Sequence, residues 1–427
     1  MDPLARRTFD HHYDKLRAGE RGVMPEDSIE PVESLPEAAA LPAGEAPLDR
    51  CVVIKLNGGL GTSMGMTGPK SLLEVKGGMT FLDLAIAQVL ALRERHGVRL
   101  PLLLMNSFAT REASMAAVAD APDVRDFLQN KIPKIDAETL EPVKWPADPA
   151  LEWCPPGHGD LYTALVTSGM LDELLDAGLR WAFVSNIDNV GAVVDERILA
   201  WVTAEGVPFC MEALARTPAD RKGGHLARRD GRLVLREIAQ TPEEDLDAFQ
   251  DVSRHRFFNT NNLWVDLEAL RGALDRRDGI LDLPLIVNRK TVDPADRSSP
   301  AVFQLETAMG AAIEVFDGAA ALLVGRERFA PTKTTGDLLV LRSDAWRLGE
   351  GARMELAAHA VPVVDLSDAY KLVGDFERRF PAGPPSLIEC ERLSVTGDVT
   401  FGSGVVVRGS VTVEGTDRVP DGAVLEG

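Results

Sequence analysis

The sequence has few cysteines, and they lie far apart. Cys51, Cys154, Cys210 and Cys390 are the only four in 427 residues, and no two of them form a C-x-x-C pair. A cysteine-bound metal cluster and a disulfide framework are therefore disfavoured, and the pattern fits a reduced cytoplasm. The first residues, MDPLARRTFDHHYDKL, contain no apolar core and do not look like a secretory signal. We therefore expect a cytoplasmic protein.

Long apolar runs and an excess of basic residues are also missing. The stretch LAIAQVLAL stops at Arg93, and the region around AMGAAIEVF carries Glu314 and Asp317, so neither can span a membrane. The 46 Lys and Arg are outnumbered by 66 Asp and Glu, which gives a net charge of −20. Because a nucleic-acid partner normally requires a basic face, this balance argues against one. Any phosphate site must gather its cations locally.

The sequence does contain the apolar content of a large globular enzyme, with 45% hydrophobic and 26% charged residues. Short apolar segments alternate with amphipathic ones. The pattern predicts strands at 51–56, 101–105, 181–186 and 209–215 and helices at 81–97, 161–178 and 195–206. This alternation indicates a doubly wound α/β sheet with its ligand at the carboxyl ends of the strands.

The last part of the chain has a six-residue period. Val395, Phe401, Val407 and Val413 are each six residues apart, and small turn residues keep the same step. This period is typical of a parallel β-helix and favours it over an ordinary β-meander. Few coils fit before Gly427, so we expect the last one to need a cap or a partner, and a homo-oligomer formed through this part is one possibility left open.

Residues 56–71 read LNGGLGTSMGMTGPKS and raise the question of which ligand needs five glycines and a lysine. Glycines permit positive φ and a close approach of the backbone to a ligand. The Walker pattern fails because Pro69 precedes Lys70, and the dinucleotide pattern G-x-G-x-x-G breaks at Met64. The pattern G-G-x-G-T-x-[LM]-x(4)-P-K of sugar nucleotidylyltransferases fits from Gly58 to Lys70.

The residue types of this loop suit nucleotidyl transfer. Backbone N–H groups freed by small glycines can face a nucleobase and a triphosphate. Lys70 can follow a phosphate group through the reaction as a point charge. Such a transfer depends on positioning and charge neutralisation, so it needs no protein nucleophile.

Further motifs extend the match along nearly the whole chain. In order they are LLMNSF, PPGHGD, VSNIDNVGA, KGGHL, EIAQTP, FNTNNLWVDL, VNRKT, QLETAMGAAI, RFAPTKTTGDLL and LSVTGDVTFGSGV. With the glycine loop, they make the chain resemble the eukaryotic-type family of UTP–glucose-1-phosphate uridylyltransferases, or UDP-glucose pyrophosphorylases. The resemblance implies an α/β fold with a doubly wound mixed sheet, a Rossmann-like nucleotidyltransferase domain, followed by a C-terminal left-handed parallel β-helix domain. We expect an N-terminal helical segment and linker at 1–48, the catalytic domain at 49–340 and the C-terminal domain at 341–427.

The resemblance also assigns site residues. Leu56, Asn57, Gly58 and Gly59 would hold the uridine end of the nucleotide, Gln129 would read the uracil, and Gly157 would pack beside the base. Lys70 and Lys333 would be catalytic and neutralise the phosphates. The sugar phosphate would contact His158, Asn186, Asp188, Asn261 and Glu306, and Asp188 would also ligate Mg²⁺ as the cofactor.

Taken singly, several of these residues have ordinary structural explanations. His158 could be a core histidine, Asp188 a helix cap or turn residue, Glu306 a helix N-terminal glutamate and Lys333 a solvated surface charge. Their motifs favour the functional roles. A phosphate beside His158 would raise its pKa and favour the imidazolium.

The predicted reaction is UTP + glucose 1-phosphate ⇌ UDP-glucose + pyrophosphate, dependent on Mg²⁺. The predicted partners are these small molecules, with neither nucleic acid nor membrane. Three alternatives stay open. They are the same chemistry on another sugar phosphate such as an N-acetylhexosamine, a non-catalytic nucleotide-sugar-binding scaffold, and a nicotinamide oxidoreductase.

Overall fold

Strand β2 (Cys51–Asn57) is buried along its whole length and lies in the middle of a ten-stranded sheet. The computed structural model describes residues 1–427. The main path of the sheet runs through β1 (Glu30–Pro31), β12 (His225–Arg229), β14 (Phe257–Asp266), β10 (Trp181–Asn186), β2, β5 (Leu102–Asn106) and β6 (Val124–Leu128). Strand β11 (Phe209–Ala215) pairs with β14, β17 (Ala320–Leu323) with β11, and β13 (Arg232–Arg236) with β12.

The sheet is mixed, with a parallel centre. Strands β10, β2, β5 and β6 are parallel neighbours, whereas β14 runs antiparallel to β10, β11 and β12. Val52 and Ile54 of β2 belong to one apolar cluster and Cys51 and Val53 to another, so successive residues face opposite sides of the sheet. Because both sides are covered by helices, β2 and β10 are largely apolar, and their polar residues Lys55, Asn57 and Ser185 lie buried toward the carboxyl ends.

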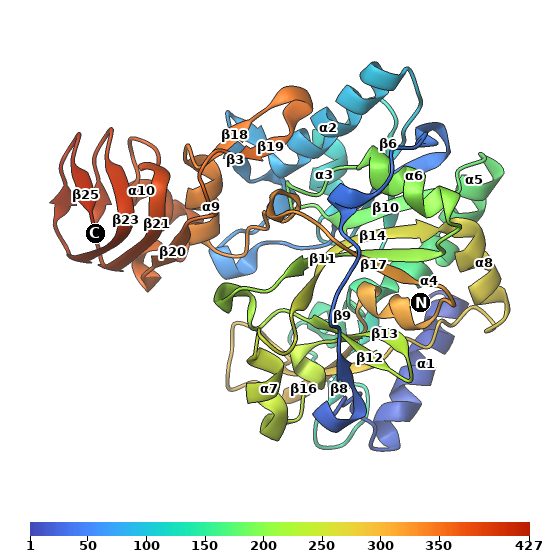
Figure 1. Cartoon of the computed structure of the whole chain (residues 1–427). Helices are drawn as coiled ribbons and strands as arrows, with labels where there is room; N and C mark the ends of the chain where they lie inside the picture. The colour runs from blue at the N-terminus through green and yellow to red at the C-terminus, as the bar shows by residue number, and fades with distance from the viewer.

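Ten α-helices surround the sheets (Figure 1). Helices α4 (Leu161–Thr167), α5 (Met170–Asp176) and α8 (Leu267–Asp275) contribute to the first of those clusters, and α2 (Phe81–His96) and α6 (Glu196–Ala204) to the second. The remaining helices are α1 (Pro3–Arg17), α3 (Arg111–Ala117), α7 (Leu246–Gln250), α9 (Thr335–Arg342) and α10 (Val373–Arg379). None of the helices is both long enough and apolar enough to cross a membrane.

The predicted strands are confirmed to within a residue or two, and the helix predicted at 81–97 is confirmed as α2. Thr80 and Asp83 form a reciprocal capping box at its start, and Gly97 ends it at φ +64°. The single helix predicted at 161–178 is wrong, because Gly169 adopts φ +74° and separates α4 from α5. An apolar face can continue across such a break, so the periodicity did not reveal it.

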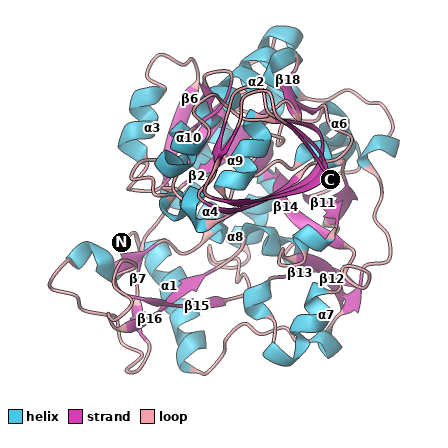
Figure 2. Cartoon of the chain, turned by 90° about the vertical axis from the view of Figure 1, so that its left-hand side faces the viewer, coloured by secondary structure: helices cyan, strands magenta, loops and turns pink.

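Smaller sheets complete the body. Strand β16 (Ala301–Glu306) lies between β15 (Ile286–Thr291) and β8 (Ile135–Asp136). Figure 2 shows this sheet beside α1 in the lower half of the molecule, where Phe9 and Leu16 of α1 pack against Leu305. Three two-stranded pairs are β3 (Glu74–Lys76) with β4 (Met79–Thr80), β7 (Ile132–Pro133) with β9 (Trp153–Cys154), and β18 (Trp346–Leu348) with β19 (Met354–Leu356).

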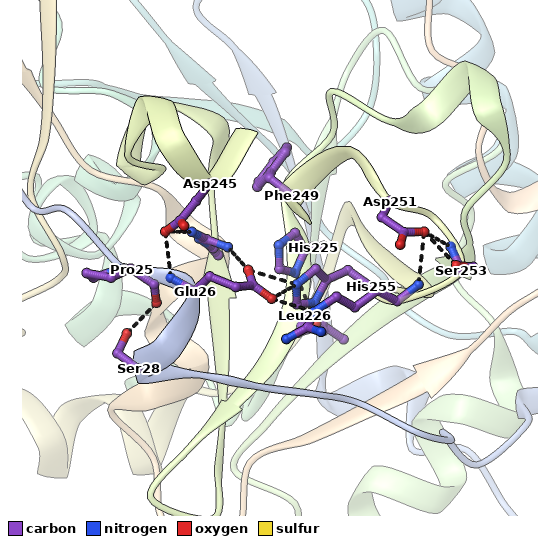
Figure 3. Close-up of polar contacts among 12 residues, drawn as sticks. Pro25, Glu26, Ser28, His225, Leu226, Asp245, Phe249, Asp251, Ser253 and His255 are labelled. Carbon is purple, nitrogen blue, oxygen red and sulfur yellow. Dashed lines mark hydrogen bonds and ion pairs between the residues drawn. The ribbon is translucent and has the colours of Figure 1, made fainter. Parts of the chain in front are cut away.

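A buried ionic cluster holds the amino-terminal segment to the body (Figure 3). The Glu26 carboxylate accepts hydrogen bonds from Arg236 at 2.5 Å, Arg254 at 2.6 Å and His255 at 2.9 Å. Burial lowers the pKa of His225, which stacks on His255 with ring centroids 3.8 Å apart, to about 2. Residues predicted as linker are thus fixed at Glu26, and β1 adds an edge strand to the main sheet.

The C-terminal strands form a separate lobe, drawn in orange to red at the left of Figure 1. They are β20 (Val363–Leu366), β21 (Ser386–Gly397), β23 (Val406–Gly415) and β25 (Val424–Glu426) in one parallel sheet, with β22 (Thr400–Phe401) parallel to β24 (Arg418–Val419). Val395 pairs with Val413 and Val406 with Val424, a separation of 18 residues or three of the predicted repeats. The six-residue period therefore produces parallel pairing.

Candidate functional site

The four parallel strands at the centre of the sheet deliver candidate residues to one edge. Gly58 follows β2, Ser107 follows β5, Gln129 follows β6, and Asp188 lies just beyond Asn186, the last residue of β10. Asn186 is in register with Leu56 of β2. Because the strands are parallel, these carboxyl ends meet at one edge, as the sequence predicts for a ligand site.

Lys70 lies at the centre of this edge. Its Nζ donates to the Asp188 carboxylate at 2.7 Å and also to the carbonyl oxygen of Thr332. Thr332 immediately precedes Lys333, so this contact brings the second predicted lysine to the same place. Three segments far apart in sequence therefore meet around one ammonium group, which is partly buried.

The glycine loop takes the shape that its composition predicts. Gly61 and Gly65 have φ values of +62° and +74°, and the Lys70 N–H donates to the carbonyl of Gly59 at 3.0 Å. At Gly61 a Cβ would come within 2.9 Å of the Met66 sulfur. The loop therefore turns back on itself and carries Lys70 to the end of β10, which a bulkier residue at these turns would oppose.

A second group of contacts gathers beside the loop. Ser107 Oγ donates to the Gly58 carbonyl at 2.9 Å, and Gln129 Nε2 donates to the Gly157 carbonyl at 2.9 Å. A Cβ on Gly58 would lie 3.0 Å from Gln129 Oε1. Gly157 has φ +79°, and a Cβ there would meet the Thr307 carbonyl at 2.6 Å. The structure thus brings Gly58, Gln129 and Gly157 together, with only glycine fitting at 157.

Asn57, unlike the glycines that follow it, is buried with its side chain hydrogen-bonded inside the protein. It is 1% exposed, and its side chain donates to Asn106 Oδ1 at 2.7 Å and to Ser114 Oγ at 2.8 Å. Its side chain therefore anchors the start of the glycine loop to β5 and α3. Leu56 is also buried, whereas Gly59 is exposed at the surface of the site.

His158 is held in one orientation by the backbone. Its Nδ1 accepts the Met309 N–H at 3.0 Å, so the neutral ring carries its hydrogen on Nε2. Burial lowers the pKa of His158 to about 4. In the protein without substrate the imidazole is therefore neutral, which differs from the expected imidazolium because no phosphate charge offsets the cost of desolvation.

Asn261 lies at an irregularity of β14. The register between β11 and β14 shifts between Glu212 and Ala213, and Asn261 has φ +61°, a conformation in which asparagine is tolerated better than most residues. Asn259 and Asn261 hydrogen-bond each other, at 2.9 Å through Asn259 Nδ2 and at 2.8 Å through the Asn261 N–H. The bulge explains how a strand so rich in asparagine departs from regular pairing.

Glu306 and Lys333 flank the site. Glu306 ends β16 and is not at a helix N-terminus, and its Cβ lies 2.9 Å from where a Gly157 Cβ would be. Burial raises the pKa of Glu306. Lys333 is exposed just before α9, and its N–H donates to Asp337 at 2.8 Å. Its ammonium group partly offsets the burial that raises the pKa of Glu237.

Sequence reasoning missed several residues that shape this edge. Asp160 accepts from the Asn130 N–H at 2.6 Å and thereby holds the residue after Gln129, and burial raises the pKa of Asp160 to about 7. Asp160 and Ser107 both lie inside motifs that had been recognised, PPGHGD and LLMNSF, so the motifs themselves were the signal. No sequence signal pointed to the Thr332 carbonyl, because every residue has a backbone carbonyl.

The arrangement suits a ligand with several phosphates. Lys70 lies at this edge beside Asp188, which offers a hard oxygen, and Lys333 follows the Thr332 carbonyl that Lys70 contacts. No group of three His, Cys, Asp or Glu side chains is placed to hold a metal ion anywhere in the chain. A single carboxylate together with substrate oxygens and waters is the usual arrangement for Mg²⁺, so the residues fit that ion better than a self-contained metal cage.

The fold is that of an α/β protein with a parallel-centred mixed sheet, and its candidate site carries the residues that the motifs predict for a nucleotidyltransferase. The family model described as UTP–glucose-1-phosphate uridylyltransferase matches residues 4–408, and the chain belongs to this family. Curated relatives of that name from Hordeum vulgare and Solanum tuberosum are each 42% identical, over 414 and 417 residues. These matches cover 94% of this chain in both cases, and 86% and 84% of the relatives.

Solved structures agree over the whole fold. A variant of UDP-glucose pyrophosphorylase from Leishmania major, in complex with UDP-glucose, is 45% identical with a TM-score of 0.95 and covers 100% of this chain and 95% of that one. A protein described as UDP-glucose phosphorylase from Trypanosoma brucei is 45% identical with a TM-score of 0.91, covering 98% and 94%. The resemblance predicted from the motifs is confirmed at the level of the family.

Proposed function

We propose that this protein makes UDP-glucose and pyrophosphate from UTP and glucose 1-phosphate. Membership of the uridylyltransferase family supports the reaction, since the similarity extends over 94% of the chain at 42% identity. The observation that carries the proposal is the contact of Lys70 with both Asp188 and the carbonyl next to Lys333. It joins Lys70 to Asp188 and to the segment that carries Lys333, which supports a role for these three residues at one site.

In the proposed mechanism, a phosphate oxygen of glucose 1-phosphate attacks the α-phosphorus of UTP. The new P–O bond forms as the bond from the α-phosphorus to the bridging oxygen of the β-phosphate breaks, and pyrophosphate leaves with the bonding electrons. Lys70 and Lys333 neutralise the charge that develops on the phosphates. Because no proton has to be removed from the attacking phosphate and no protein nucleophile is used, alignment supplies the rest of the rate enhancement.

Asp188 would hold Mg²⁺ together with phosphate oxygens and water. When bound, the ion would polarise the phosphates and screen their charge. In the protein without substrate, the ammonium group of Lys70 donates to the Asp188 carboxylate. Lys70 would therefore turn from Asp188 to the phosphates as the substrate enters. Both ends of this ion pair are partly exposed, which leaves the exchange open to solvent.

The remaining residues divide between base and sugar. Gly58, Gly59 and Gln129 would bind the uracil edge, with Gly157 packed against it. His158 would donate its Nε2–H to a substrate phosphate, since its Nδ1 already accepts the Met309 N–H. Asn186, Asn261 and Glu306 would bind the sugar nucleotide, because amides donate and accept and a carboxylate accepts from hydroxyls.

We propose that the chain divides into the domains that the motifs predict. Residues 49–340 would form the catalytic domain, with 1–48 laid against it. Residues 341–427 would form the C-terminal domain ending in a left-handed parallel β-helix, through which copies would associate. The 18-residue parallel register supports the coil, and a cytoplasmic location remains the prediction of the cysteine pattern.

The experiment is a pyrophosphate-release assay with purified protein, Mg²⁺, glucose 1-phosphate and each of UTP, ATP and TTP. UTP should be used at least ~100-fold better than ATP, because a site that hydrogen-bonds one base leaves buried groups unpaired with another. N-acetylglucosamine 1-phosphate is tested in parallel, and a preference for it would change the proposed sugar. Binding of UDP-glucose without any turnover would favour the non-catalytic nucleotide-sugar-binding scaffold. Binding of a nicotinamide cofactor in a spectroscopic titration would favour the oxidoreductase.

A further inference from the structure

The residue after Asp188 is buried and makes an unusually complete set of hydrogen bonds. Asn189 is 2% exposed. Its Oδ1 accepts from the N–H groups of Gly191 at 3.3 Å and Ala330 at 2.8 Å. Its Nδ2 donates to Asn262 Oδ1 at 3.1 Å and to the Arg328 carbonyl at 3.1 Å. One amide group thus uses both donors and both acceptor positions.

These four bonds join three segments of the proposed site. Gly191 belongs to the turn that carries Asp188, and Asn262 lies beside Asn261 in the bulge of β14. Ala330 and Arg328 belong to the segment leading to Lys333, where Asn189 also forms an isolated antiparallel bridge with Pro331. The Asn189 side chain therefore sets how far the Asp188 turn lies from the lysine-bearing segment.

The segment that Asn189 contacts is itself fixed from beneath. Arg328 donates to the Glu212 carboxylate at 2.7 and 2.5 Å and to the Val193 carbonyl at 2.9 Å. Glu212 is fully buried and accepts from Asn262 Nδ2 at 3.0 Å as well. A Cβ at Gly191 would come within 2.3 Å of the Glu327 carbonyl, which shows how closely turn and segment pack. These contacts hold the segment in place, and Asn189 joins it to the turn that carries Asp188.

We infer that Asn189 is a positioning residue, which holds Asp188 and the Lys333 segment in the relative placement that uridylyl transfer requires. The inference rests on the proposed function, since it assigns no chemistry to Asn189 itself. Asn189 is buried, and its side chain is fully engaged by the protein. Its loss should therefore act on catalysis and on the Mg²⁺ requirement while leaving the nucleotide pocket around Gly58 and Gln129 able to bind UTP.

The test compares Asn189→Asp and Asn189→Ala with the wild-type protein. Asp keeps the shape but removes both donors and places a carboxylate against two oxygens, and Ala removes all four bonds without adding charge. Calorimetry with UTP counts binding-competent sites, and pyrophosphate release gives kcat per such site and the Mg²⁺ concentration for half-maximal rate. We expect kcat to fall about 100-fold, as for a displacement of about 1 Å in the reacting geometry, and the Mg²⁺ requirement to rise.

Tyr370→Phe is the matched control, because it removes one fully buried hydrogen bond, to the Val399 carbonyl, in the C-terminal lobe. It should leave kcat per UTP site and the Mg²⁺ requirement unchanged. The inference is overturned if either measure is unaltered in Asn189→Ala, if Tyr370→Phe changes them equally, or if Asn189→Ala cannot bind UTP, which would assign the residue to folding. A wild-type protein without turnover would instead defeat the proposed function.

Discussion

At the scale of single residues, Lys70 carries the largest share of the proposed chemistry. Lys70→Met keeps the length of the side chain and removes its charge, and Asp188 is then left without its partner. Loss of one preorganised contact to transition-state charge costs about 10²- to 10³-fold in kcat. We expect a loss of that size in the pyrophosphate-release assay, with the fold intact by circular dichroism.

Lys76→Met is the control for that variant. Lys76 is also a half-buried lysine that donates to backbone carbonyls, those of Arg342 and Ser343, but it lies outside the site. Its replacement should cost stability and leave kcat within about threefold, because it does not meet the charge that develops in the reaction. Equal losses in the two variants would show that removing any such lysine damages the protein.

His225, which is buried beside the Glu26 cluster, predicts a pH dependence of stability. The pKa of His225 falls from 6.5 to about 2 on burial. The unfolded chain therefore binds a proton at this residue below about pH 6.5 while the folded one does not, so the contribution of His225 to stability is lost as pH falls from 6.5.

His225→Phe should remove that dependence while keeping the stack on His255 and Phe249. Urea unfolding at several pH values between about 6.5 and 4 should show a free energy that declines less steeply with falling pH than in the wild type. The expected difference in slope is about 1.4 kcal/mol per pH unit. Parallel slopes would mean that His225 titrates alike in both states.

The candidate residues of the site could be named from the sequence, because long motifs contain them, and their roles stay predictions. The hydrogen-bond partners of these residues could not be named in the same way. The bond from Lys70 to Thr332 uses a backbone carbonyl, and the buried role of the Asn57 side chain depends on Asn106 and Ser114, which come from other elements. Sequence patterns indicate which groups are needed, whereas hydrogen-bond partners are fixed only when distant segments pack.

At the scale of elements, the turn before α4 is tightly constrained by backbone geometry at Gly157. Gly157→Ala should both strain a positive φ and drive a Cβ into the Thr307 carbonyl. Gly206 is at φ +63° and has nothing near its Cβ position, so a substitution there measures the strain of a positive φ without a steric clash. Gly206→Ala should cost about 1 kcal/mol of stability and leave activity unchanged.

Gly157→Ala should destabilise more than Gly206→Ala and also raise the KM for UTP, because Gln129 hydrogen-bonds the Gly157 carbonyl. Thermal melts and initial rates at varied UTP measure both effects. Equal melting temperatures with an unchanged KM would remove the turn from the nucleotide pocket.

Element types followed from the sequence wherever local signals agreed. Capping at Thr80 and the glycine at 97 fixed α2 at both ends. The break at Gly169 and the bulge at Asn261 were not predictable, because a glycine within an amphipathic pattern is also tolerated in a helix, and a bulge depends on the partner strand.

At the scale of the whole molecule, the C-terminal lobe presents an edge. Strand β25 pairs with β23 and forms the end of its sheet, and Val424 in it is 52% exposed. If copies associate through this edge, Val424→Lys should weaken the association, since a charge on an edge strand opposes strand pairing. Sedimentation velocity should show a shift to smaller species, and Val23→Lys, equally exposed at 52% on the main body, should show none. A wild-type protein that is monomeric at all concentrations would contradict this.

Class and order of elements could be predicted from alternating patterns, but long-range assembly could not. The antiparallel place of β14 between β10 and β11, and the pairing of β1 with β12, join segments with no local signal for each other. Such pairings depend on which edges remain free after the centre of the sheet has formed.

The most direct test of the central claim is a crystal structure of the protein with UTP and Mg²⁺. We predict that the triphosphate will lie between the glycine loop and the segment before α9, with the ammonium groups of Lys70 and Lys333 on its oxygens and the metal on Asp188. A nucleotide bound elsewhere, or a triphosphate that neither lysine touches, would contradict it.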